Sequence, residues 1–176
     1  MKINIVLYHP EIPQNTANII RTAVAIDATL HLIKPYGFEF DLNHHIIKRS
    51  STNYADELKY VEYENFSEFE KANDMSLCRF ITRHGTMLYT EAVIDNQEEI
   101  YYVFGSESSG IDREILNKYP NQLCRIPTIV NMRSLNLSNC VALVAYDGLR
   151  QVDFNDLSKE EVLKKDFLKG EQPNGN

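Results

Sequence analysis

Residues 15–21 form the first of three clusters whose residue types could carry chemistry. Asn18 and Arg21 lie three positions apart, so they share one face of the helix that is predicted there. An arginine guanidinium can hold a phosphate or a carboxylate through two parallel hydrogen bonds. The cluster is therefore a candidate functional face, although a capped surface helix with a solvated arginine would have the same sequence.

Residues 104–110, with the sequence Phe-Gly-Ser-Glu-Ser-Ser-Gly, form the second cluster. A glycine directly after a strand lets the backbone approach a ligand closely, and the exposed amides of such a turn can bind polar groups. The segment matches neither a Walker A loop nor a GxGxxG motif, which argues against a nucleotide-binding enzyme of the doubly wound kind. A plain strand-to-helix turn is the alternative.

Residues 125–139 form the third cluster. Ser134, Asn136, Ser138 and Asn139 place polar side chains where an apolar helix is predicted to begin. One of these side chains can cap the helix. Four are more than capping needs, and the surplus indicates a binding role for the segment.

The hydrophobic pattern predicts the elements that must position these clusters. Apolar and β-branched runs predict strands over residues 3–8, 29–33, 58–63, 77–82, 100–104 and 122–126. Helices are predicted over residues 42–49, 67–72 and 137–150 and from residue 112. A further helix should follow a cap at Asn15 or Thr16, because the two prolines in residues 9–14 should keep that loop non-helical.

This alternation of strands and helices predicts an α/β domain, with a mainly parallel sheet flanked by helices. Ligands of such sheets bind at the carboxyl ends of the strands. The loops 83–85, 105–110 and 127–136 are all expected at that edge, and all three hold glycine or polar residues. The helix over residues 137–150 is apolar around most of its circumference, so it should be covered on more than one side.

Length and composition predict one globular domain. The chain has 176 residues, 43% of them hydrophobic and 24% charged. No apolar run is long enough for a membrane span, and the first residues lack a secretory cleavage site. Cys78, Cys124 and Cys140 have no metal-ligand spacing, which indicates buried thiols in the reducing cytoplasm.

The charge distribution limits how this chain could bind nucleic acid. The net charge of −7 argues against a general nucleic-acid coat protein, which would carry a basic field. Acidic residues concentrate in residues 54–120, while the segments on either side are close to neutral. Any contact with RNA is therefore expected to use a few placed arginines on those flanking segments, with a second subunit or a partner widening the surface.

The three clusters, in this order, resemble the motifs of the SPOUT family of knotted RNA methyltransferases. Residues 5–21 are similar in particular to the YibK-like (TrmL) branch, and the resemblance runs from about Met1 to Gln151. It implies a SPOUT domain over residues 1–152 with a C-terminal trefoil knot, followed by a polar tail over residues 153–176. It also implies a homodimer in the cytoplasm whose partner is tRNA, with no membrane partner.

The implied reaction is methyl transfer from S-adenosyl-L-methionine, without a metal, to the ribose 2′-hydroxyl of the wobble nucleotide, cytidine or uridine 34 of tRNA. By position in the motifs, Arg21 is the implied catalytic residue, and Asn15, Arg21 and Asn136 are implied RNA contacts. A guanidinium stays protonated at neutral pH, so a phosphate clamp is the preferred role for Arg21. The residues implied to bind the cofactor are Ile81, Gly105, Ile126, Ser134 and Leu135.

Other functions stay open at this point. The substrate nucleotide could lie at another tRNA position or in rRNA, and a non-catalytic RNA-binding module is a further alternative. The chain departs from the family pattern at Ala17, at Ser109 and at the pair Arg83–His84. These departures concern the RNA contacts more than the cofactor pocket.

Overall fold

A seven-stranded sheet forms the centre of the computed structural model, which describes residues 1–41, 57–92, 98–131, 134–154 and 157–160. The strand order is β3-β2-β1-β6-β4-β7-β5, and every pair of neighbours is parallel. The strands are β1 (Lys2–Tyr8), β2 (Thr29–Ile33), β3 (Lys59–Tyr63), β4 (Cys78–Ile81), β5 (Met87–Leu88), β6 (Glu99–Phe104) and β7 (Leu123–Arg125). The predicted α/β class with a parallel sheet is confirmed, whereas the strand order does not test the predicted knot.

Among the residues that the structure describes, four α-helices flank this sheet. They are α1 (Pro13–Ala25), α3 (Phe66–Ala72), α4 (Arg113–Lys118) and α5 (Leu137–Gln151). All four helices were predicted from the sequence, and so were six of the seven strands; the two-residue strand β5 was not. The helix predicted over residues 42–49 lies outside the described residues.

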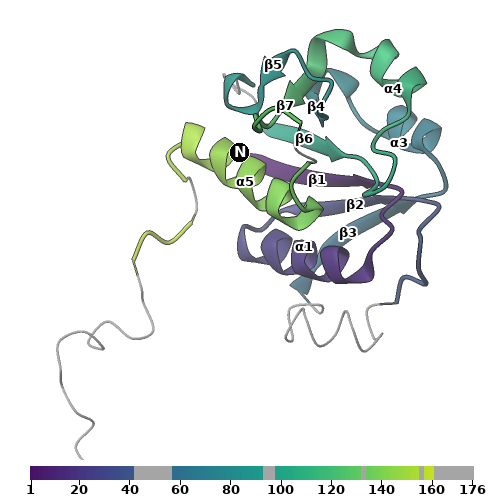
Figure 1. Ribbon diagram of the computed structural model, residues 1–176. Helices are drawn as coiled ribbons and strands as arrows, with labels where there is room; N and C mark the ends of the chain where they lie inside the picture. The colour runs from purple at the N-terminus through teal and green to yellow at the C-terminus, as the bar shows by residue number, and fades with distance from the viewer. Residues whose placement is uncertain (42–56, 93–97, 132–133, 155–156, 161–176) are drawn as a thin grey trace, which may run out of the picture.

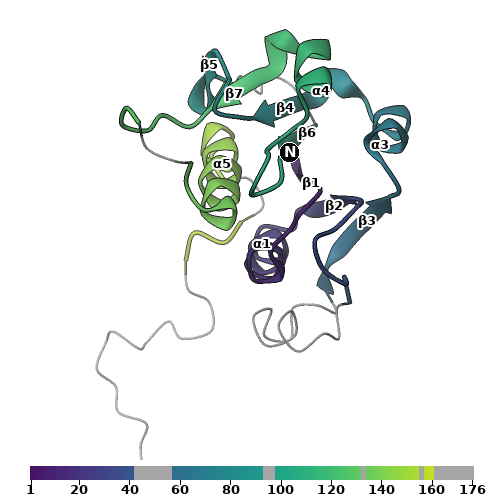
Figure 2. The ribbon, with the colours of Figure 1, turned by 45° about the vertical axis from the view of Figure 1, so that its right-hand side comes forward.

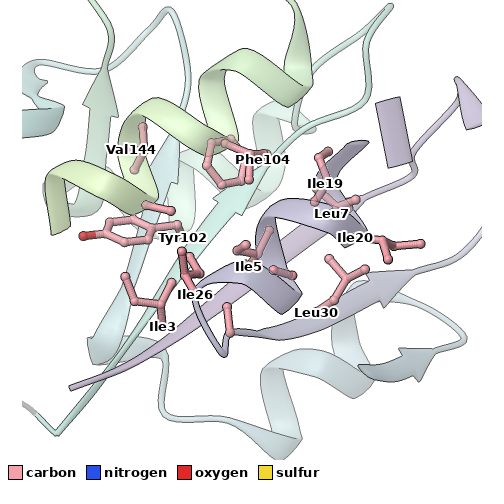
Figure 3. Close-up of a cluster of buried hydrophobic side chains, with 14 of the residues drawn as sticks. Ile3, Ile5, Leu7, Ile19, Ile20, Ile26, Leu30, Tyr102, Phe104 and Val144 are labelled. Carbon is pink, nitrogen blue, oxygen red and sulfur yellow. The ribbon is translucent and has the colours of Figure 1, made fainter. Parts of the chain in front are cut away.

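The helices divide between the two faces of the sheet. Helices α1 and α5 lie side by side on one face, and α3 and α4 lie on the other (Figures 1 and 2). Figure 3 shows the core under α1 and α5, where Ile19 and Ile20 of α1 and Val144 of α5 pack on sheet residues such as Leu7 and Phe104. A separate core, which includes Phe69 and Leu116, fills the opposite face. Since both faces are covered, the polar clusters can meet only at the ends of the strands.

Helix α1 begins earlier than predicted, at Pro13. The cap residue is Ile12, whose side chain makes no capping hydrogen bond, so the expected cap at Asn15 or Thr16 is wrong. Proline is tolerated in the first turn of a helix because the N–H that it lacks would have no partner within the helix there. Asn15 and Thr16 are therefore helical residues, both buried.

Helix α5 is buried on one side only. Val141, Val144, Ala145 and Leu149 pack into the core under the helix, as the sequence predicted for an apolar helix. On its other side Leu143 and Tyr146 stay exposed, and no described residue covers them. The predicted cover on more than one side is thus absent within the described part of a single chain.

A buried histidine sits on the α3 side of the sheet. His31 of β2 is only 5% exposed, and its ring nitrogens lie 2.9 Å from the hydroxyl of Tyr63 and 3.2 Å from Oδ1 of Asn4. The rings of Phe69 and Tyr101 pack against it edge-on. Burial lowers the pKa of His31 to about 4, with a smaller contribution from the nearby positive charge of a lysine.

We expect this histidine to make the fold sensitive to acid. Because the pKa is lower in the folded chain, the unfolded chain binds the extra proton between about pH 6.5 and pH 4. With respect to His31, the free energy of unfolding is therefore at its full value above pH 6.5, and it falls by up to about 3 kcal/mol as the pH drops through that window. Urea unfolding at pH 7 and pH 4.5 should show a larger loss for the wild type than for His31→Gln, which cannot titrate. Equal losses in the two proteins would contradict this prediction.

Candidate functional site

The carboxyl ends of β4, β6 and β7 lie next to one another. In the register of the sheet, Ile81 at the end of β4 pairs with Phe104 of β6 and with Cys124 of β7. The backbone N–H of Thr82 then donates to the carbonyl of Cys124 over 2.8 Å. The loops that leave these three strands are the 83–85, 105–110 and 127–136 loops, so they start from one edge of the sheet, as the sequence predicted.

A cleft of about 510 Å³ opens at this edge, between the 82–84 turn, residues 126–131 and 134–135, and the start of α5. Its volume lies in the range of pockets that bind small molecules. The lining residues are Ile81, Thr82, Arg83, His84, Arg125, Ile126, Thr128, Ile129, Val130, Asn131, Ser134, Leu135 and Cys140. A second hollow of about 470 Å³ is lined by residues that include Ser76 and Gln122, and none of its lining residues belongs to the three clusters.

Four of the five residues that the resemblance assigns to the cofactor line this cleft: Ile81, Ile126, Ser134 and Leu135. The fifth, Gly105, does not. A Cβ at Gly105 would lie 2.5 Å from the backbone nitrogen of Ile111, so glycine is needed here because the 105–110 loop closes on itself. The close approach at Gly105 is thus to the chain's own backbone, and its contact with a cofactor stays a prediction.

Two side-chain amides join the first and third clusters. The Nδ2 group of Asn136 donates to Oδ1 of Asn15 over 2.9 Å, and Nδ2 of Asn15 donates to Oε1 of Glu107 over 2.9 Å. Asn15 is 5% exposed, so its amide is committed to these two partners. This burial favours a positioning role for Asn15 over a direct contact with RNA.

The carboxylate of Glu107 takes the place of the missing cap of α1. Its Oε2 accepts from the backbone N–H of Glu11 over 2.9 Å, and its Oε1 accepts from that of Ile12 over 3.3 Å. A negative charge at this end of a helix is also stabilised by the helix dipole. In return, Glu11 accepts from the backbone N–H and the hydroxyl of Ser108 over 2.9 and 2.6 Å. Sequence reasoning missed this arrangement, because the partners are 92 to 97 residues apart.

Asn136 is the cap of α5. Its Oδ1 accepts from the backbone N–H of Ser138 over 2.9 Å and from the hydroxyl of Ser138 over 2.7 Å. One of the polar residues of the third cluster was predicted to cap this helix, and that prediction is confirmed. The same side chain therefore fixes the start of α5 and, through Asn15, ties it to α1.

Arg21 lies on the solvent face of α1. Asn18, three residues earlier, is exposed on the same face, as predicted. Arg21 is not among the residues that line the cleft of its own chain. Its assignment to the RNA substrate therefore rests on the motif and stays a prediction.

The residues of the cleft fit an adenosyl-amino-acid ligand. Apolar side chains such as Ile81, Ile126 and Leu135 offer a surface for an aromatic base, and Thr128 and Ser134 offer polar groups for a sugar. Arg125 lines the same cleft, and its Nε is one of two buried side-chain polar atoms without a partner among the described residues. A buried N–H without an acceptor is costly, which is consistent with a site shaped to receive a polar ligand.

The described part of the chain also bears on other kinds of site. No group of three or more histidine, cysteine, aspartate or glutamate residues there could hold a metal ion. No helix in the same part of the chain is long and apolar enough to cross a membrane.

Comparison with known sequences gives consistent matches along most of the chain. The model of the SpoU rRNA Methylase family matches residues 2–146. A tRNA (cytidine(34)-2′-O)-methyltransferase of Saccharophagus degradans is 37% identical over 152 residues, which cover 86% of this chain and 96% of the relative. A Listeria monocytogenes protein that is provisionally named for the same activity is 40% identical over 161 residues, covering 91% of this chain and 94% of the relative.

Comparison with solved structures gives the same result. A provisionally described RNA methyltransferase of Bacillus anthracis superposes with a TM-score of 0.81 at 35% identity, covering 90% of this chain and 99% of the other. A structure described as giving insight into the 2′-OH methylation of C/U34 on tRNA has a TM-score of 0.77 at 34% identity, covering 87% and 97%. The AdoMet complex of AviRb from Streptomyces viridochromogenes, at 21% identity and a TM-score of 0.73, covers 85% of this chain and 57% of the other and supports the fold alone.

The junction that Glu107 forms with Glu11, Ile12 and Asn15 can be tested by Glu107→Gln. The amide has one acceptor oxygen in place of two, and its NH₂ group would face a backbone N–H of Glu11 or Ile12. We expect a loss of about 2 kcal/mol in the free energy of unfolding, as is typical for hydrogen bonds to a charged group. Glu114→Gln, at an exposed position of α4, is the matched control and should have little effect. Chemical denaturation of both variants decides the matter, and equal stabilities would count against the junction.

Proposed function

The chain belongs to the SpoU rRNA methylase family, and we propose that it methylates the ribose 2′-hydroxyl of nucleotide 34, the wobble nucleotide of tRNA, with S-adenosyl-L-methionine as the donor. The relative in Saccharophagus degradans is named for cytidine 34, and one structural neighbour concerns C/U34 of tRNA. Both are similar to this chain over more than four fifths of its length, which supports the same substrate here.

The observation that carries the proposal is the cleft at the carboxyl ends of β4 and β7. Residues from two separate loops converge there, and four of them stand at positions that the family uses for its cofactor. We assign Ile81, Ile126, Ser134 and Leu135 to the binding of S-adenosyl-L-methionine. When bound, this group supplies an electrophilic methyl on a cationic sulfur. Gly105 contributes by letting the adjoining 105–110 loop fold tightly beside the cleft.

The chain's own part in the reaction is to position the substrate. The apolar walls of the cleft exclude water, and Arg21 holds a phosphate of the tRNA with its planar guanidinium, which orients the ribose. The proton of the 2′-hydroxyl passes to a phosphate oxygen held in this way, because a guanidinium that stays protonated cannot accept it. In this proposal Arg21 is the catalytic residue.

Asn15 and Asn136 keep the two halves of the site in register. Asn15 belongs to the helix that carries Arg21, and Asn136 caps the helix that borders the cleft. Their hydrogen bond fixes the distance between the RNA clamp and the cofactor. We therefore assign both asparagines a positioning role, with Asn136 exposed enough to contact the RNA as well.

We further propose that the working form is a cytoplasmic homodimer. Leu143 and Tyr146 on the outer side of α5 are 38% and 45% exposed, and Ile129 and Val130 of the neighbouring loop are more exposed still. Apolar surface of this kind is typical of an interface between subunits. Pairing two chains would also widen the area available to tRNA, which the net charge of −7 otherwise disfavours.

The role of Arg21 can be tested with single-turnover methylation of a tRNA anticodon stem-loop. Arg21→Ala should lower the rate by about a hundredfold or more, because misplacement in an oriented reaction commonly costs that much. Arg21→Lys should keep part of the activity, since it retains the charge but loses the two-pronged geometry. Arg113→Ala, at an exposed position of α4, serves as the control and should stay close to the wild-type rate.

The pH dependence of the same reaction separates a clamp from a base. If Arg21 positions the substrate, raising the pH should not restore the rate of Arg21→Ala. If Arg21 removed the proton, hydroxide would replace it in part and the rate would recover. Full recovery at high pH would disprove the clamp. A wild-type protein that leaves nucleotide 34 unmethylated would disprove the proposed substrate.

The dimer makes a separate prediction about α5. Tyr146→Asp places a charge on the exposed apolar side of the helix, where desolvation in an interface would be costly. We expect the wild type to sediment as a dimer at micromolar concentration and the variant to shift toward the monomer. Glu114→Asp, on the opposite face of the sheet, should leave the assembly unchanged. A wild-type monomer with full activity would overturn this part of the proposal.

A further inference from the structure

We propose that Arg125 forms an anion subsite inside the cleft and that its ligand is the carboxylate of the cofactor's amino-acid part. The inference rests on the proposed function, because it assumes that S-adenosyl-L-methionine occupies the cleft. It goes beyond that function by giving one side chain a role in recognising a defined chemical group of the cofactor.

The first support is the environment of Arg125 itself. The residue ends β7 and is half-buried, and its Nε lies buried without a hydrogen-bond partner among the described residues. None of the ion pairs found in that part of the chain includes it. A buried guanidinium N–H normally has an acceptor, since leaving it without one costs free energy. The acceptor is therefore expected from a molecule that enters the cleft.

A second support is the close packing that brings another guanidinium, that of Arg83, to the same cleft as Arg125. The turn after β4 is tied down by the hydrogen bond from Thr82 to the carbonyl of Cys124. At Gly85 a Cβ would lie 2.7 Å from the backbone nitrogen of Arg125, so only glycine lets this turn pass so close to the end of β7. As a result Arg83 and His84 also line the cleft, close to each other: Nε of Arg83 donates to Nε2 of His84 over 3.4 Å.

The third support is the balance of charge in the cleft. Arg83 and Arg125 line it, whereas none of the lining residues that the structure describes is an aspartate or a glutamate. This local excess of positive charge occurs in a chain whose net charge is −7. A concave site that gathers cations in an acidic protein is suited to an anionic group.

The position of Arg125 favours the cofactor's carboxylate over a phosphate of the RNA. Arg125 is half-buried and adjoins Ile126, one of the residues assigned to the cofactor, whereas Arg83 is exposed at the mouth of the cleft. A guanidinium matches a carboxylate with two parallel hydrogen bonds. We therefore assign the inner position to the carboxylate.

The experiment compares two ligands by isothermal titration. S-adenosylhomocysteine carries the carboxylate, and its decarboxylated analogue lacks only that group. Arg125→Gln should weaken binding of S-adenosylhomocysteine by about tenfold to a hundredfold, in the range expected for hydrogen bonds to a charged group. It should change binding of the decarboxylated analogue by less than about threefold, because removing an interaction that the ligand cannot make has little effect. Arg113→Gln removes the same charge from exposed α4 and should leave both affinities unchanged.

Two further measurements test the subsite without relying on the affinity of Arg125→Gln for S-adenosylhomocysteine. The wild type alone should prefer S-adenosylhomocysteine over the analogue by a similar factor. Binding of labelled tRNA to Arg125→Gln should stay close to wild type if the anion belongs to the cofactor.

The outcomes separate the inference from the function on which it rests. Equal losses for both ligands, no loss for either, or a loss confined to tRNA would each overturn the carboxylate subsite. A wild type that binds neither ligand would instead refute the proposed cofactor.

Discussion

The carboxylate of Glu107 is the constraint on which the arrangement of the site depends. Glu107 belongs to the 105–110 loop, which follows the central strand β6. Its carboxylate accepts hydrogen bonds from two backbone N–H groups at the start of α1 and from the side-chain amide of Asn15. Asn15 in turn accepts from Asn136, the cap of α5. A single negative group thus holds the start of α1 and, through Asn15, the side chain that caps α5; α5 borders the cleft, and α1 carries the proposed RNA clamp.

The sheet makes such a junction necessary. Both of its faces are buried, under α1 and α5 on one side and under α3 and α4 on the other (Figure 2). Polar side chains buried in either core need partners there, as His31 finds in Tyr63 and Asn4. The edge formed by the carboxyl ends of the strands is left for ligands. The turn after β4 is held by the hydrogen bond from Thr82 to Cys124 and by the close passage of Gly85 over β7, and the 105–110 loop is closed by the hydrogen bonds between Ser106 and Gly110.

The distribution of charge fits an enzyme that binds its RNA at a few points. The protein is acidic overall, yet the cleft is lined by two arginines and a histidine and by no carboxylate. Positive groups thus stand at the two places where the proposed reaction needs them, with Arg21 on α1 and Arg125 in the cleft. Specificity in such a protein depends on the positions of individual side chains more than on a general attraction to nucleic acid.

The sequence alone determined the elements and the edge at which they present the site. The runs that become β1 and β6, the apolar face of α5 and the cap at its start are all encoded in residues close together in the chain, where periodicity and capping act. The start of α1 and the burial of Asn15 were not predictable in this way. They depend on Glu107, 92 residues away from Asn15, and on Asn136, which is 121 residues away. Such contacts exist only once the sheet has brought the loops to one edge, and no local pattern in the sequence specifies which donor will face which acceptor.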